Sequence, residues 1–170
     1  MKKFEKILIW SFLGIIIFAW TVCFVPFIGF GGSYDKVCAD AAAAYGLDAN
    51  DYDIRFQKKI KNSYGEPVQG LYRVEKDKEI IIIQNMWSRP MMVATIFHEF
   101  AHAAQHAHKL DFGGHSCEQH AEILSFSKMW QSDYKWNGVH LLYLHLVGKS
   151  GEYRATSTLW HIAFTNETVA

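Results

Sequence analysis

The chain has 170 residues, and its 17 lysines and arginines balance 17 aspartates and glutamates, so the formal net charge is zero. This length suits a single domain with a hydrophobic core of its own. Without an excess of positive charge there is no field to attract a polyanion, which argues against nucleic-acid binding.

A long uncharged segment, from Ile7 to Phe30, follows three lysines at the N-terminus. An apolar run of about 20 residues is long enough to cross a bilayer as a helix. We therefore predict that residues 1–30 form an uncleaved membrane anchor, which contacts the lipid bilayer through residues 7–30. A cleaved signal peptide is the main alternative, because the lysines resemble its basic n-region, and a buried core helix is another. Lysines ahead of the segment favour a single-pass topology with a cytoplasmic N-terminus and the remaining domain on the extracytoplasmic side.

Residues 31–34 are a predicted linker, and residues 35–170 are predicted to form one domain. The first part of this domain shows patterns for four elements. In chain order these are a helix stopped by Gly46, a half-buried strand at 52–60, a turn-rich loop at 62–70 and a hairpin at 71–84 that turns near Lys76. The second arm of the hairpin has four consecutive β-branched residues, Ile80 to Ile83, so both of its faces should be covered.

Two helices are predicted after the hairpin. The first covers about residues 90–109, with Ser88 as its N-cap and a proline in its first turn. The sequence DFGG at 111–114 ends this helix, and a second helix is predicted at about residues 116–131. The tail, residues 136–170, has no clear period, and no element is predicted there.

Cysteine usage says little about the compartment. Cys23 lies in the predicted anchor, which leaves Cys38 and Cys117 in the predicted domain. In an oxidising compartment these two could form a disulfide, and the alternative is two buried free thiols.

The first helix after the hairpin carries the motif H-E-x-x-H. His98 and His102 are four residues apart, so they lie on one face, one turn apart, and their imidazoles can bind one ion at Zn–N distances of about 2.0–2.1 Å. Glu99 lies about 100° away around the helix, from where it can reach a water on the metal without being a ligand. The opposite face is apolar and should face the core. It consists of Val93, Ile96, Phe97, Phe100, Ala103 and Ala104.

H-E-x-x-H on a helix is the signature of zinc metallopeptidases. Neutral imidazoles leave Zn²⁺ with enough charge to lower the pKa of a bound water to about 7. Glu99 would take a proton from that water and pass it to the leaving amine, acting first as a general base and then as a general acid. The alternative is a surface helix with two solvated histidines and a glutamate.

A third zinc ligand has to come from outside the motif. His106 lies two turns from His98, too far to share an ion on a straight helix. His108 falls on the last position of the longer metzincin pattern. Gln105 stands where that pattern needs a glycine, so the helix should continue and His108 should point away from the metal.

The second helix offers a better candidate. Glu118 and Glu122 are four residues apart and share one face, whereas His120 lies on nearly the opposite side. An H-E-x-x-H helix followed by a helix with E-x-x-A-[D/E] resembles the gluzincins, which include thermolysin, the CAAX-prenyl-protease family and the compact ImmA/IrrE-type peptidases. The resemblance covers residues 71–131.

This resemblance implies that Glu118 is the third zinc ligand and that Glu122 orients a ligating histidine without touching the metal. Two features depart from the family's usual pattern: the orienting residue is a glutamate rather than an aspartate, and the gap between His102 and Glu118 is short. Glu122 therefore remains an alternative ligand. Three histidines are further alternatives: His108, His115 and His120.

The resemblance also implies the fold class, α+β. The expected fold is a small zincin-like domain, after an N-terminal transmembrane helix, in which a short β-sheet packs on the active-site helix and a second, ligand-bearing helix. In zincins the strand before the active-site helix forms the edge of the cleft, where extended substrate adds to the sheet. Residues 79–84 are the candidate, although a buried central strand would have the same pattern. Candidates for stabilising an oxyanion lie in the tail: His140, Tyr143, His145, Tyr153 and His161.

The prediction is a membrane-anchored, zinc-dependent metallopeptidase that hydrolyses peptide bonds of a peptide or protein substrate by means of a metal-activated water. One alternative is a non-catalytic zincin-fold protein in which a structural zinc supports a binding module. Another is a histidine-rich metal-handling protein that binds several ions weakly.

Overall fold

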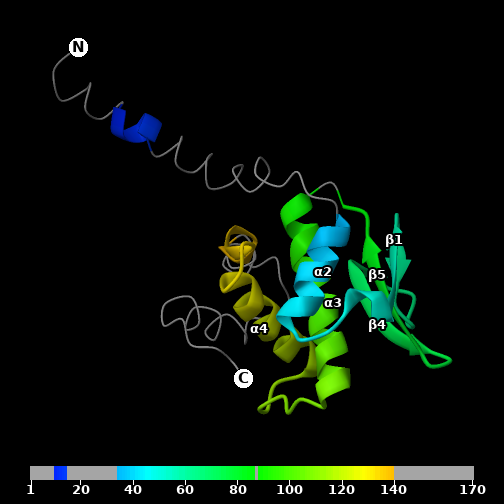
Figure 1. Ribbon diagram of the computed structural model, residues 1–170. Coiled ribbons are helices and arrows are strands. Elements are labelled where there is room, and N and C mark those ends of the chain that lie inside the picture. The colour runs from blue at the N-terminus through cyan, green and yellow to red at the C-terminus, as the bar shows by residue number, and fades with distance from the viewer. Residues whose placement is uncertain (1–9, 15–33, 87, 140–170) are drawn as a thin grey trace. The chain divides into compact units, whose positions relative to one another are not determined.

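The computed structural model describes residues 10–14, 34–86 and 88–139 (Figure 1). The chain divides into two units, residues 1–31 and 32–170, and in the first unit residues 10–14 are helical. The predicted anchor beyond this short piece, most of the linker and the tail from residue 140 lie outside the described residues. Among the residues that are described, no helix combines the length and the apolar character needed to cross a bilayer.

The second unit is a small mixed α+β fold, which confirms the predicted fold class at that level. In its described residues, three complete helices accompany a three-stranded sheet and a two-stranded sheet, and residues 135–139 are also helical. The helices are α2 (Tyr34–Ala44), α3 (Arg89–His108) and α4 (Cys117–Trp130), with a short 3₁₀ turn at Ala49–Asp51. The strands are β1 (Tyr52–Gln57), β2 (Ile60–Lys61), β3 (Pro67–Val68), β4 (Gly70–Glu75) and β5 (Lys78–Gln84).

The larger sheet has the order β1-β5-β4, with β1 parallel and β4 antiparallel to β5. The predicted hairpin is confirmed: Glu75 pairs with Lys78, and the two residues between them, Lys76 and Asp77, have φ angles of 48° and 65°. Two consecutive positive φ angles are those of a type I′ turn, whose twist matches that of the flanking strands. The turn is formed without a glycine.

The central position of β5 corrects one prediction. Residues 79–84 are the predicted candidate for the edge of a cleft, but β5 has a partner strand on each side, and the edge strands of this sheet are β1 and β4. Coverage of both faces of this strand is confirmed, because Ile80 to Ile83 are all buried. Ile80 and Ile82 pack with Ile60 on one face. Alternation turns the other two isoleucines to the opposite face.

The strand predicted at 52–60 and the loop predicted at 62–70 also differ from the structure. The strand ends at Gln57, and Ile60 belongs to β2, which pairs with β3 inside the predicted loop. Ile60 is in phase with Tyr52, Ile54 and Phe56 across the polar residues 57–59, so the pattern did not show that the chain leaves one sheet and enters another. The small β2–β3 sheet covers the face of β5 that carries Ile80 and Ile82.

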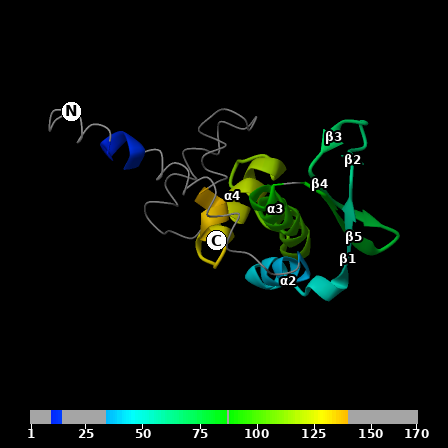
Figure 2. The same cartoon turned by 90° about the horizontal axis from the view of Figure 1, so that it is seen from above.

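The helices lie on one side of the three-stranded sheet, with α3 between the sheet and α4 (Figures 1 and 2). The apolar face predicted for α3 is confirmed, since every residue of the predicted set is buried. The Tyr45 hydroxyl, just beyond α2, donates to the Phe97 carbonyl of α3 at 3.0 Å. Gly46, with φ of 71°, ends α2 in the left-handed region as predicted.

The two predicted ligand-bearing helices occur within a residue or two of their expected bounds. Ser88 occupies the N-cap position of α3, but its side chain makes no capping hydrogen bond, which corrects its predicted role. The C-cap of α3 is Lys109, whose φ of 51° is left-handed and whose N–H bonds to the Gln105 carbonyl. α4 begins with a capping box, in which Ser116 and Gln119 each bond the other's backbone N–H.

Candidate metal centre

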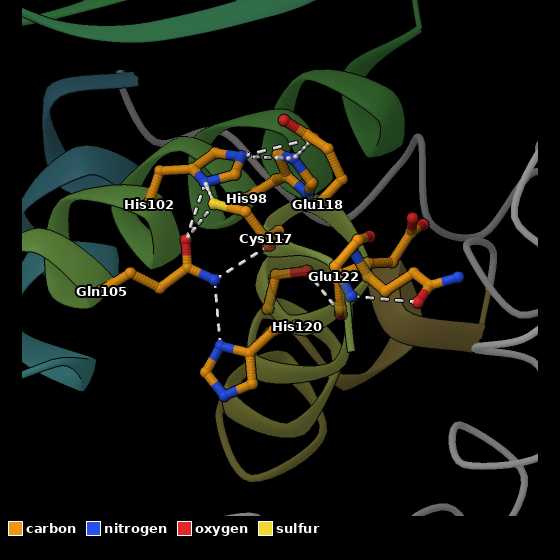
Figure 3. A network of polar contacts seen from close by, with 10 residues as sticks. His98, His102, Gln105, Cys117, Glu118, His120 and Glu122 are labelled. Atoms are coloured by element: carbon orange, nitrogen blue, oxygen red, sulfur yellow. Dashed lines mark hydrogen bonds and ion pairs between the residues drawn. The ribbon is translucent and has the colours of Figure 1, made fainter. Parts of the chain in front are cut away.

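Two imidazoles of α3 and one carboxylate of α4 meet at one point above the helix surface (Figure 3). His98 Nε2 and His102 Nε2 are 3.1 Å apart, and their rings are nearly perpendicular. Glu118 Oε2 lies 3.2 Å from His98 Nε2 and 3.4 Å from His102 Nε2. We call these three residues the donor triad.

The dimensions of the donor triad match those of a tetrahedral zinc site. Ligand atoms placed about 2.0–2.1 Å from one tetrahedral Zn²⁺ lie about 3.3 Å from one another. The three observed separations, 3.1, 3.2 and 3.4 Å, lie close to this value. The donor types, two imidazole nitrogens and one carboxylate oxygen, are also those of a catalytic zinc site. The residues present therefore fit the ion that the motif predicts.

The electrostatics of the donor triad favour a cation at its centre. Hydrogen bonds with His102 and His98 hold the pKa of the Glu118 carboxyl far below its usual range. Burial lowers the pKa of His98, but its hydrogen bond with Glu118 and the charges of Glu99, Glu122 and Glu118 outweigh this, so the net shift is upward. Carboxylates thus surround the imidazoles with negative charge, as a divalent ion would require.

Glu99 lies beside the donor triad and is almost fully buried, with 5% of its surface exposed. Burial raises the pKa of its carboxyl, although the nearby imidazoles of His98 and His102 and a backbone hydrogen bond from Tyr72 act in the opposite direction. A raised pKa suits a group that accepts and then releases a proton.

Gly70, the first residue of β4, closes the other side of Glu99. A Cβ atom at position 70 would lie 2.2 Å from Glu99 Oε1, which is a steric clash. Sequence reasoning placed this glycine in a loop and missed it. Its only signal was an isolated glycine next to a strand, which can mark a close approach of the backbone to another group.

The donor triad and Glu99 open into a cavity of about 770 Å³. β4 contributes one wall through Gly70, Leu71 and Tyr72, and α3 contributes Met91 and Thr95. Across the cavity, α4 contributes Cys117, Glu118, Glu122 and Ser125. The edge strand and the donor triad thus face the same space.

Glu122, the predicted orienting residue, lines this cavity one helical turn beyond Glu118, and its charge raises the pKa of His98. The histidines considered as alternative ligands lie elsewhere. His108 Nε2 is 3.0 Å from the Tyr45 carbonyl, and His120 is buried with Nδ1 2.9 Å from Gln105 Nε2.

The remaining predicted positions fall outside the site or outside the described residues. His106 is exposed beside Glu79, at 3.3 Å, as its spacing from His98 predicted. His115 lies in the loop before α4. The oxyanion candidates of the tail, His140 and beyond, are not among the described residues.

Both cysteines of the described domain are free thiols. Cys38 is buried in α2, where burial raises its pKa to about 12. Cys117 is exposed at the start of α4, so the expectation of two buried thiols is correct for Cys38 alone.

No known protein family, curated protein or solved structure matches this chain.

Proposed function

We propose that this protein is a zinc-dependent peptidase of the gluzincin type, with a zincin-like domain that follows a membrane anchor at residues 1–30. Zn²⁺ would be held by His98, His102 and Glu118, and Glu99 would be the catalytic base. The observation that carries the proposal is the donor triad, whose separations of 3.1–3.4 Å suit one tetrahedral ion. The topology, with the domain on the extracytoplasmic side, rests on the three N-terminal lysines.

The chemistry proposed is hydrolysis of a peptide bond. When bound, Zn²⁺ would lower the pKa of a water molecule and polarise the substrate carbonyl. Glu99 accepts one proton from the water as the oxygen of the water bonds to the carbonyl carbon of the substrate. Glu99 then delivers that proton to the amide nitrogen as the C–N bond breaks, which leaves a carboxylic acid and an amine. The buried position of Glu99, with its raised pKa, supports this double use of one carboxyl.

The substrate is proposed to be a peptide or protein segment in an extended conformation. β4 is an edge strand of the three-stranded sheet, and its residues Gly70 to Tyr72 line the same cavity as the donor triad. An extended segment can add to such an edge by backbone hydrogen bonds, which would place its carbonyl groups beside Glu99.

The decisive experiment pairs Glu99→Gln with His98→Ala in the full-length chain. Glutamine keeps the shape of Glu99 but cannot accept the proton, so Glu99→Gln should retain one zinc per chain. Its hydrolysis of a fluorescence-quenched peptide library should fall by about 10²–10⁴-fold, the usual contribution of a general base. His98→Ala should lose both zinc and activity.

Two results would contradict the proposal in different ways. Full activity in Glu99→Gln would remove Glu99 from the reaction. Wild-type protein that binds one zinc per chain but cleaves no peptide would favour the structural-zinc alternative, in which the site supports a binding module.

A further inference from the structure

Gln105 lies at the centre of a polar network that joins the donor triad to the start of α4 (Figure 3). Its Oε1 is 2.9 Å from His102 Nδ1 and accepts from Cys117 Sγ at 3.1 Å. Its Nε2 donates to the Cys117 carbonyl at 2.9 Å and lies 2.9 Å from His120 Nδ1. The residue is buried, with 6% of its surface exposed, so these contacts satisfy the whole amide group.

The network leaves only one orientation for the Gln105 amide. The backbone carbonyl of Cys117 can accept a hydrogen bond but cannot donate one, so the NH₂ group of Gln105 must face it. The amide oxygen must then face His102 Nδ1, and an oxygen acceptor requires a donor opposite it. His102 therefore carries a proton on Nδ1, and Nε2, which faces His98 and Glu118, is the ring nitrogen left to bind an ion.

We infer that Gln105 is a positioning residue, which fixes the tautomer and ring orientation of His102 so that Nε2 is free to bind the metal. This inference rests on the proposed function. Histidines that bind metals generally donate their second ring N–H to an acceptor, which fixes the ring and strengthens the ligand. Gln105 supplies that acceptor here. The resemblance to gluzincins implied Glu122, on α4, for the role of orienting a ligating histidine.

The other end of Gln105 gives it a second effect on the same site. Its bond to the Cys117 carbonyl ties α3 to the residue just before Glu118, the ligand that α4 contributes. One side chain thus sets both the orientation of His102 and the approach of Glu118 to it. Loss of Gln105 should therefore weaken metal binding without removing any ligand.

The tautomer of His102 can be measured directly in the full-length protein by ¹⁵N NMR of its imidazole, with and without zinc, at a pH where imidazoles are neutral. His102→Asn identifies the signal. The expected result is a proton on Nδ1 already in the zinc-free protein. An Nδ1 without a proton in the zinc-free protein would overturn the inference, whether or not the chain binds zinc.

Zinc affinity, measured by competition with a chelating indicator, tests the consequence. Gln105→Leu keeps the size of the side chain but removes both polar ends, and it should lower affinity roughly 10- to 100-fold. Gln105→Glu keeps an acceptor for His102 and loses the donor to Cys117, so it should retain the Nδ1 proton and recover part of the affinity. Tyr45→Phe is the matched control, because it removes a different buried hydrogen bond to α3, the one to the Phe97 carbonyl.

The outcomes separate this inference from the proposed function. If His98→Ala binds zinc as tightly as the wild type, the donor triad is not the zinc site and the proposed function fails. If His98→Ala loses zinc but Gln105→Leu binds within about twofold of the wild type, the donor triad stands and the role of Gln105 is wrong. Should Gln105→Leu fail to fold, the NMR measurement on the wild type and the affinity of Gln105→Glu still decide.

Discussion

The contact between Gly70 and Glu99 allows a single methyl group to test how the catalytic carboxyl is held. In Gly70→Ala the new Cβ would lie 2.2 Å from Glu99 Oε1 and 2.7 Å from both Cδ and Cγ. Ordinary contact begins near 3.4 Å, so the carboxyl group would have to withdraw by about 1.2 Å. Gly70 is not among the glycines with positive φ, so alanine fits its backbone and the perturbation is steric alone.

A displacement of this size should reduce the rate rather than the metal content. A misplacement of about 1 Å in a catalytic group can cost about 10²-fold in rate. We therefore expect kcat/KM of Gly70→Ala to fall about 100-fold on a quenched fluorescent peptide that the wild type cleaves. Zinc per chain, measured by elemental analysis, should stay at the wild-type level, because the three atoms nearest to the added Cβ all belong to Glu99, which is not a ligand.

Gly138→Ala is the matched control for this experiment. Its added Cβ would lie 3.6 Å from the Phe126 ring, an ordinary contact, so activity and zinc content should both be unchanged. The reasoning would be refuted if Gly70→Ala kept wild-type activity with an unchanged circular dichroism spectrum. Loss of zinc from Gly70→Ala would also contradict it, since the effect would then act on the ligands.

Three further predictions follow from the site and the helix ends. Glu118→Ala removes a ligand, so in chelator competition its zinc affinity should be more than about 100-fold below that of the wild type. This exceeds the loss expected when only a residue that orients a ligand is removed. Wild-type affinity in Glu118→Ala would exclude Glu118 as a ligand. The net upward shift of the His98 pKa, from 6.5, means that protons compete with zinc as pH falls through a value above 6.5. Zinc affinity should drop there by about 10-fold per pH unit for each proton displaced, and a flat profile from pH 8 to about pH 6 would contradict this. Lys109 has a left-handed φ at the end of α3, a conformation that costs a lysine more than a glycine. Lys109→Gly should therefore raise the free energy of unfolding by about 1 kcal/mol, measured by urea denaturation. A loss of stability would show that the contacts of the Lys109 side chain outweigh this backbone strain.

The features that sequence predicted well are local ones. Helical spacing places His98 and His102 on one face whatever the rest of the fold does, and the same spacing places the apolar residues on the other. Hairpin pairing is also local, because Glu75 and Lys78 meet across a two-residue turn. Four adjacent isoleucines could be recognised as buried on both faces, since a run of β-branched residues is typical of a strand with both faces covered.

The features that sequence could not predict depend on which segments meet. Strand order is not local, so the sequence could not decide whether residues 79–84 form an edge strand or the central strand that β5 is. Gly70 approaches Glu99 only because β4 lies along α3, and an isolated glycine beside a strand does not show which group its backbone approaches. Gln105 was within reach of sequence reasoning, being three residues from His102 on the same helix face, but it was considered only as the absence of a glycine.

The short gap between His102 and Glu118, a departure from the usual gluzincin pattern, has a physical explanation in the turn between α3 and α4. The chain reverses within a few residues because Lys109, Gly113 and Gly114 all adopt left-handed φ angles. The capping box at Ser116 then starts α4 at once, which puts Glu118 in the first turn. There the partial positive charge of the helix N-terminus stabilises its carboxylate before any metal binds.

The same turn explains why Glu118 rather than Glu122 meets the two histidines. Glu122 lies four residues further along α4, about 6 Å along the helix axis. It therefore lies one turn beyond the residue that Gln105 ties to α3 through the Cys117 carbonyl. A ligand held next to such an anchor loses little conformational freedom when an ion binds, which favours tight binding. If this reasoning is correct, Glu118→Ala should not be rescued by the neighbouring Glu122, and Gln105→Leu should weaken the contribution of Glu118 as well as that of His102.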